Sequence, residues 1–412
     1  MTPRCWYRFA LLATAHFSAW TQPSGCNAPA PSPSVTIAVP TSPFAVAPTR
    51  DGCWLFVSGI GGAGEKTGVA VLQRDAGRIA LARMVPLSSN AATGMALTHD
   101  GKLLVVAVGD SVDFLDVDRL ISGAAQPLLG SFGDGSGAAS VYANITADDK
   151  LLFVSDEGQR SITVVDLERA RANGYKAAAI VGKIPVGNAP IALTFSPDGK
   201  WLYTTSEGAL PEWQWPKACK PEGADPAKAA VVNPEGAVLV VDVARARTDP
   251  ANAVAARVPA GCSPVRMAIS PGGERIYVTA RNSNAVLTFD TAKLVADPEH
   301  ARLAMVPVGA APVPVAVIDG GRKVVAGNSN RFARSSEPQS LTVLDAAKMR
   351  DGAAATLGTI PAGAFPREMA VSSDGRTLFL TNFGSQSLQV IDCLLYTSVP
   401  SLISEWAFSR PR

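Results

Sequence analysis

The stretch Leu193-Thr-Phe-Ser-Pro-Asp-Gly-Lys-Trp-Leu-Tyr203 contains two short runs of β-favouring residues separated by a tight turn. In such a turn proline presets φ and glycine accepts a positive φ. Similar stretches run from Met267 to Tyr277 and from Met369 to Phe379, and each is followed by a third β-favouring run that ends in aspartate. Such an aspartate is expected to accept hydrogen bonds from N–H groups of the next turn. Each unit therefore predicts at least three antiparallel strands.

The turn recurs seven times at intervals of about 50 residues, with one longer interval before the fifth copy. The copies align at Gly52, Gly101, Asp149, Gly199, Gly273, Gly321 and Gly375. A period of this length with several strands per unit is typical of a radial β-repeat. The predicted fold is all-β: a seven-bladed β-propeller of four-stranded antiparallel blades.

The ends of the repeat predict how the ring closes. The run Val35-Thr-Ile-Ala-Val-Pro40 resembles a fourth strand, whereas the last repeat stops at its third strand, Leu388 to Asp392. The N-terminal strand is therefore expected to complete the seventh blade and to remove an exposed sheet edge. The propeller is predicted to occupy residues 35–392.

The segments outside the ring have their own signatures. Residues 1–26 combine Arg4 and Arg8 with a short apolar run and predict an export signal; Gly25-Cys26 leaves a lipoprotein signal as the alternative. Residues 27–34 are predicted to form a linker. The tail 393–412 begins with Cys-Leu-Leu-Tyr-Thr-Ser, which resembles a translated sequencing-library adapter, so it is either an artefact or an apolar tail that packs on the ring.

Composition bounds the chemistry. The 412 residues are 47% hydrophobic and 17% charged, with a net charge of +2, which argues against a polyanion-binding surface over the whole protein. The six cysteines include no Cys-x-x-Cys pair, and outside the signal only His99 and His300 remain. The sequence therefore predicts neither a metal site nor a cofactor.

Two repeats resemble a known family most clearly. They are Tyr277-Val-Thr-Ala-Arg-Asn-Ser-Asn-Ala-Val-Leu-Thr-Phe-Asp290 and Phe379-Leu-Thr-Asn-Phe-Gly-Ser-Gln-Ser-Leu-Gln-Val-Ile-Asp392. Both are similar to the strand phrase of the YVTN-type, or YncE-like, β-propeller repeat family. The resemblance implies the propeller fold but not one function, because such propellers serve as scaffolds, nucleic-acid binders, lactonases and redox-cofactor subunits.

The candidate site lies at the mouth of the central channel. The second position of each first strand is small in most repeats, but Tyr142, Arg266 and Glu368 are exceptions, and Arg367 lies beside Glu368. These residues are expected to bind a polar ligand, with Arg266 as the anion contact, or else to close the channel with a salt bridge. The loops between second and third strands are expected to add rim residues, among them Arg281, Asn328 and Asn382.

The longest insertion, about Gly208 to Glu235, lies in the fourth repeat and contains Trp213, Trp215 and Cys219. The tryptophans either stack on a ligand or pin the loop to its blade. Cys219 and Cys262 lie in loops expected on the same face of adjacent repeats, which predicts a disulfide in an exported protein; Cys53 is the competing partner.

These features predict an exported, periplasmic or extracellular propeller, lipid-anchored if Cys26 is acylated. It is expected to be monomeric and non-catalytic, and to bind a protein, a glycan or a small polar ligand through its loop face. The alternatives are a lactonase-like hydrolase and a single-stranded nucleic-acid binder. The latter would need a basic mouth with stacking aromatics.

Overall fold

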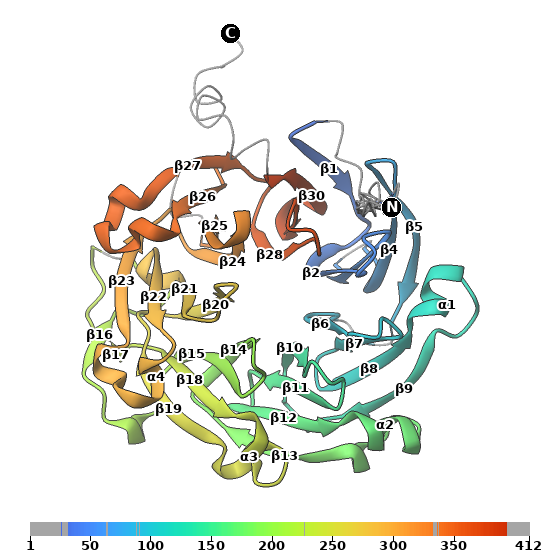
Figure 1. Ribbon diagram of the computed structural model, residues 1–412, viewed down its shortest axis with the longest axis horizontal. Coiled ribbons are helices and arrows are strands. Elements are labelled where there is room, and N and C mark those ends of the chain that lie inside the picture. The colour runs from blue at the N-terminus through green and yellow to red at the C-terminus, as the bar shows by residue number, and fades with distance from the viewer. Residues whose placement is uncertain are drawn as a thin grey trace, which may run out of the picture.

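The computed structural model describes Cys26 and residues 32–393, apart from 63–64, 88, 90, 226, 333–335 and 337. Seven four-stranded antiparallel sheets surround a central axis (Figure 1), which confirms the predicted fold class. In each blade the first strand lies innermost and the sheet runs outward. The expected export signal, apart from Cys26, and most of the tail lie outside the described residues.

The strands follow the repeat closely. Blade 1 comprises β2 (Ser42–Pro48), β3 (Trp54–Ile60), β4 (Gly68–Asp75) and β5 (Arg78–Pro86). Blade 2 comprises β6 (Met95–Leu97), β7 (Leu103–Ala107), β8 (Ser111–Asp116) and β9 (Leu128–Gly133). Blade 3 comprises β10 (Ser140–Ile145), β11 (Leu151–Asp156), β12 (Ser161–Asp166) and β13 (Ile180–Pro185). Blades 4 and 5 are formed by β14 (Asn188–Phe195), β15 (Trp201–Gly208), β18 (Ala237–Asp242) and β19 (Val254–Pro259), and by β20 (Pro264–Ile269), β21 (Arg275–Ala280), β22 (Ala285–Asp290) and β23 (Arg302–Pro307). Blade 6 comprises β24 (Pro312–Ile318), β25 (Lys323–Asn328), β26 (Ser340–Asp345) and β27 (Thr356–Pro361).

Blade 7 joins the two ends of the chain. It consists of β28 (Pro366–Val371), β29 (Thr377–Asn382) and β30 (Ser387–Asp392), with β1 (Ser34–Ala38) as its outer strand. β1 pairs antiparallel with β30, so that Val35 lies opposite Val390 (Figure 1). The strand begins and ends slightly earlier than the sequence pattern predicts, but the closure is the expected one.

The Ser-Pro-Asp-Gly turns are held by their own side chains. In blade 4 the hydroxyl of Ser196 donates to Asp198 Oδ1 at 2.5 Å, and the same oxygen accepts from the backbone N–H of Lys200. Gly199 has a φ of 69°, which explains the glycine at this place. Equivalent hydroxyl–carboxylate pairs occur in the turns at Thr98, Thr146 and Ser372. The repeated phrase is therefore a self-contained turn.

The aspartates that end the third strands have a capping role. Asp116, Asp166 and Asp242 each accept the N–H of the residue three positions on, and so cap α1 (Val117–Ser122), α2 (Leu167–Asn173) and α3 (Val243–Ala246). This confirms the expected backbone hydrogen bonds. The helices themselves were not predicted, because four to seven residues are too few to show a helical period. A further short helix, α4 (Lys293–Ala296), follows β22.

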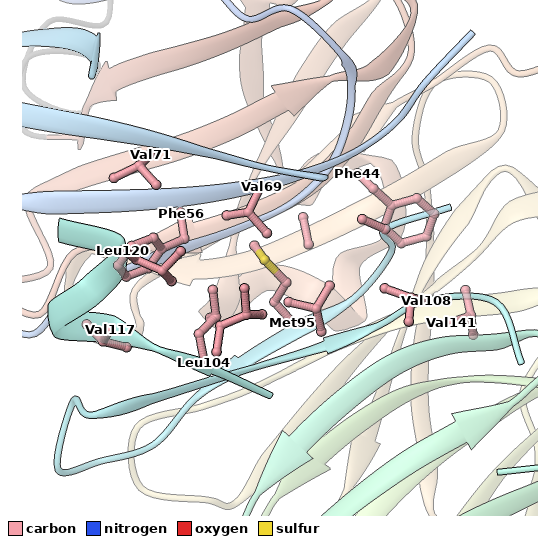
Figure 2. Close-up of a cluster of buried hydrophobic side chains, with 14 of the residues drawn as sticks. Phe44, Phe56, Val69, Val71, Met95, Leu104, Val108, Val117, Leu120 and Val141 are labelled. Carbon is pink, nitrogen blue, oxygen red and sulfur yellow. The ribbon is translucent and has the colours of Figure 1, made fainter. Parts of the chain in front are cut away.

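A ring of apolar side chains surrounds the axis. Its members come from the same position of the first strand in several blades: Phe44, Val141, Ile191, Val265 and Val313. These residues belong to a larger apolar cluster. Figure 2 shows part of that cluster, with Phe44, Val108 and Val141 at one end and Val117 and Leu120 at the other. Arg367 occupies the equivalent place in blade 7 and is buried. The axis is therefore lined mainly by apolar side chains, with a charged group at this position in blade 7.

Buried hydroxyls join neighbouring blades near this ring. The Thr279 hydroxyl donates to the carbonyl of Val313 at 2.7 Å, and that of Thr381 donates to the carbonyl of Phe44 at 3.1 Å across the closure. Ser58, Ser155 and Thr205 make the same bond to the next blade. In blade 6 the place is taken by Gly327, where a Cβ would lie only 2.6 Å from Pro314. The serine or threonine of the second strand is thus an inter-blade contact.

Thr279→Val is expected to lower the free energy of unfolding by about 1–2 kcal/mol, because the carbonyl of Val313 and the N–H of Arg266 would lose a buried partner. The matched control is Thr288→Val in the same blade, since Thr288 is equally buried and its hydroxyl has no hydrogen-bond partner. Urea unfolding should show a loss for the first variant and little or no loss for the second. Equal losses would contradict the inter-blade role.

Candidate functional site at the channel mouth

Three predicted residues occupy equivalent places on the first strands of blades 3, 5 and 7. The backbone N–H groups of Arg266 and Glu368 donate to the hydroxyls of Thr279 and Thr381, the same register in two blades. Tyr142 pairs with Ser155 in the corresponding register of blade 3. Because these strands are the innermost of their blades, their side chains meet at the axis.

Arg266 and Glu368 form a buried ion pair. Nε of Arg266 lies 2.7 Å from Oε2 of Glu368, and the two side chains are 3% and 10% exposed. Neither atom makes a hydrogen bond, so the N–H does not point at the carboxylate oxygen. The other two guanidinium nitrogens of Arg266 are also buried without a hydrogen-bond partner. The sequence left a salt bridge as the alternative to a ligand site. The structure contains that salt bridge, but the guanidinium group of Arg266 makes no hydrogen bond in it.

Aromatic faces cover both arginines. The guanidinium carbon of Arg266 lies 4.6 Å from the centre of the Tyr142 ring, and that of Arg367 lies 4.1 Å from the centre of the Phe44 ring. The Phe365 ring is farther away, with its centre 5.9 Å from the guanidinium carbon of Arg367. Cation–π contacts of this kind stabilise a desolvated guanidinium without using its N–H groups. Phe44 was missed in the sequence analysis, although aligning the repeats one position earlier would have placed it beside Arg367.

Burial dominates the electrostatics of this cluster. It raises the pKa of the Tyr142 phenol; Glu368 adds to the rise and Arg266 opposes it. Tyr142 is therefore a neutral hydroxyl at physiological pH. Burial also lowers the pKa of Arg367 to about 9; Arg266 adds to the fall and Glu368 opposes it. Arg367 still carries its charge at neutral pH.

The axial cluster consequently holds two guanidinium groups against one carboxylate. Four of its buried guanidinium nitrogens, three on Arg266 and Nη1 of Arg367, have no hydrogen-bond partner. A buried donor without an acceptor costs free energy, and buried charges cost more. An arrangement with surplus positive charge and surplus donors suits an anion. Among the described residues no group of three or more His, Cys, Asp or Glu side chains could hold a metal ion.

The structure corrects the expected placing of two rim residues. Asn328 and Asn382 lie inside their blades rather than on the rim. The amide nitrogen of Asn328 donates to Ser340 and Thr342, and that of Asn382 donates to Ser387 and Gln389. The reason is that each asparagine still belongs to its second strand, where it shares a sheet face with the polar residues directly and diagonally opposite on the third strand.

Arg281 is likewise buried and paired. It forms a two-point contact with Glu222 and a 2.8 Å contact with Glu207, and its side chain is 3% exposed. Burial raises the pKa of Glu207, and Arg281 opposes that rise. Because Glu222 belongs to the blade 4 insertion, Arg281 ties the insertion to blade 5 and does not face the axis as a free cation.

The insertion is fastened at further points. It contains a two-stranded sheet of β16 (Lys217–Cys219) and β17 (Asn233–Pro234). Cys219 is bonded to Cys262 in the crossover to blade 5, with a Cα separation of 5.6 Å, which is the pairing expected from the sequence. Trp213 and Trp215 pack against the hydrophobic core of blades 3 and 4. The tryptophans therefore pin the insertion, and the stacking alternative has no support here.

A second disulfide joins Cys26 to Cys53 in the first turn of blade 1. Cys53 is thus not a partner of Cys219 or Cys262. Acylation of Cys26 and this disulfide exclude each other, because both use the same sulfur. Two disulfides fit an oxidising compartment outside the cytosol.

The fold defines the class of the protein: a seven-bladed β-propeller. A family model described as the choice-of-anchor I domain matches residues 93–260, which comprise blades 2 to 4. The YVTN-type assignment stays a prediction, since no family match confirms it. A comparison with curated proteins finds no match.

Solved structures include similar propellers. One titled hydrazine synthase, from Kuenenia stuttgartiensis, superposes with a TM-score of 0.62 and covers 86% of this chain and 97% of its own. The sequences are 18% identical, so the likeness shows the fold alone. In the part of the chain that the structure describes, no helix is long and apolar enough to cross a membrane.

Proposed function

We propose that the protein is an exported β-propeller binding protein that takes up a small anion, or the anionic group of a larger partner, at the axis beside Arg266 and Arg367. The carrying observation is the set of four buried guanidinium nitrogens that make no hydrogen bond; one of them, Nε of Arg266, lies beside the Glu368 carboxylate. The guanidinium groups of Arg266 and Arg367 together with the carboxylate of Glu368 leave one surplus positive charge. This imbalance favours a monoanion over a neutral sugar or a cation.

Each axial residue has a definable part in such binding. Arg367 is the more exposed of the two arginines, at 8% against 3% for Arg266, and it would meet an incoming anion first. Glu368 holds Arg266 in place and limits the charge that the site accepts. Tyr142 supplies a neutral hydroxyl and an aromatic wall. Phe44 supports Arg367 from the apolar ring.

The two alternatives have less support. A nucleic-acid site would need free arginines and stacking aromatics at the mouth, whereas Arg281 is paired with glutamates and Trp213 is packed on the core. For a lactonase-like hydrolase, the axial cluster offers Glu368 as its carboxylate, and that group is engaged with Arg266. We therefore keep the binding function as the proposal.

Thermal shifts and calorimetry with acetate, sulfate and a neutral sugar test the proposal, with chloride at equal ionic strength as the reference. Acetate is expected to raise the melting temperature of the natural protein, and Arg367→Met is expected to weaken acetate binding at least about tenfold, the effect of losing one charge-assisted contact. Arg376→Met, at an exposed turn on the opposite face, is the matched control and should bind normally. Binding unchanged in Arg367→Met, or no anion effect at all, would refute an anion site at the axis.

A further inference from the structure

Two carboxyl groups meet in the interior of blade 3, away from the axial cluster. Asp156 ends β11 and is fully buried; Asp134 lies in the 134–139 crossover from blade 2 and is 3% exposed. The Ser140 hydroxyl lies 2.5 Å from Oδ2 of Asp134 and 3.2 Å from Oδ1 of Asp156. Oδ1 of Asp134 is buried without a hydrogen-bond partner. The single hydroxyl proton cannot satisfy both carboxylates.

The repeat shows what blade 3 has changed. The position of Asp156 at the end of the second strand is taken by Asn328 in blade 6 and by Asn382 in blade 7. Those amides donate to hydroxyl and amide groups of the third strand. Asp156 instead accepts from Thr163 at 2.6 Å and from Ser161 at 3.3 Å. A neutral donor has thus been replaced by an acid beside a second acid.

The charges around the pair do not balance when both acids are ionised. Lys183 of β13 lies 2.8 Å from Oδ2 of Asp156 and also bonds Gln159. A further charged side chain bonded to the crossover is Asp110, whose carboxylate accepts the N–H groups of Gly137 and Ala139. One lysine therefore faces two buried carboxylates, with a third carboxylate close by. Burial raises the pKa of Asp134 to about 7, and Asp156 adds to the rise.

We propose that Asp134 and Asp156 form a proton-binding site: one proton held between them keeps the 134–139 crossover closed on blade 3, and loss of that proton loosens the crossover. The crossover is also bonded through Gln159, which donates to the carbonyl of Ser136. A proton removes the repulsion between the carboxylates and supplies the missing donor to an oxygen of the pair. This proposal does not depend on the anion site.

The direction with pH follows from the raised pKa. In the unfolded chain Asp134 ionises near pH 4, whereas the folded pair holds its proton up to about pH 7. The contribution of this proton to the free energy of unfolding is therefore fully present below about pH 4. It falls as the pH rises toward 7 and changes no further above that pH. Opening of the crossover is expected to become more frequent across the same range, because the opened segment releases the proton there as the unfolded chain does, and to level off above about pH 7.

Hydrogen exchange of the 134–140 amides at pH 6 and pH 8, corrected for intrinsic rates, tests the proposal. In the natural protein the opening equilibrium of this segment should rise about tenfold between the two pH values, because linkage allows about one decade per pH unit below the folded pKa and no further rise above it. Asp134→Asn should abolish this rise, because its amide is neutral and can donate to Asp156 permanently. Asp118→Asn, on the exposed surface of α1, is the control and should keep the natural pH dependence.

A second variant guards against misfolding of the first. Asp156→Asn restores the residue that blades 6 and 7 carry, and it should likewise make protection of the crossover independent of pH. The same pH dependence in both asparagine variants and the natural protein would overturn the proposal. A crossover that opens more in Asp134→Asn than in the natural protein at pH 8 would overturn it too.

Discussion

A chain of residues 41–393 is expected to melt about 5–10 °C below a chain of residues 27–393, as a loss of several kcal/mol implies for a domain of this size. The reason is that removal of β1 leaves the outer edge of β30 unpaired from Ser387 to Ile391. It also uncovers the core that Val39 and Ile37 help to close between blades 7 and 1. Differential scanning calorimetry of the two chains measures the effect.

The comparison isolates the strand, because both chains lack Cys26 and therefore both lack its disulfide with Cys53. Ending both at Cys393 is deliberate, since Cys393 is buried and its N–H bonds the carbonyl of Arg376. Equal melting temperatures would show that β1 does not close the ring. Neither chain contains residues 394–412, so the rest of the tail does not enter the comparison.

Glu368→Gln is expected to lower the free energy of unfolding by about 3–5 kcal/mol, the usual cost of removing one partner from a buried ion pair. Two arginines would then remain at the axis without a counter-charge, and burial already lowers the pKa of Arg367. Denaturant unfolding at neutral pH measures the loss. Saturating acetate should recover part of it if the axis binds anions.

The double variant Arg266→Met with Glu368→Met is the matched control. Replacing both partners by apolar side chains of similar size is often neutral or stabilising, because no buried charge of the pair is left behind. The double variant should therefore be more stable than Glu368→Gln. If both lose the same stability, the axial pair acts through packing rather than through charge.

Much of the architecture could be predicted because its signals are local. Each Ser-Pro-Asp-Gly turn is built from side chains within about five residues of one another, so the phrase itself carries the geometry. The near-constant period then implies radial repetition, and the phase of the two ends implies closure by the N-terminal strand. The short capped helices escaped prediction because they are shorter than the pattern that identifies a helix.

The candidate site was predictable only in part. Aligning the repeats placed Tyr142, Arg266 and Glu368 at one level, and the structure brings them together at the axis. The same alignment put Asn328 and Asn382 on the rim, where the structure has them buried. Register along a strand is visible in a repeat, but the direction of a side chain at a strand end depends on the local twist and bulge.

By itself the sequence determined the seven turns, the number of blades and the strand that closes them, because each rests on residues adjacent in the chain or on a regular period. Only the tertiary structure decided which charges share a buried space. Glu368 lies against Arg266 from two blades away, and Asp134 meets Asp156 from the crossover between blades 2 and 3. The free energy of such groups depends on burial and on the distance between charges, and neither is a property of sequence order.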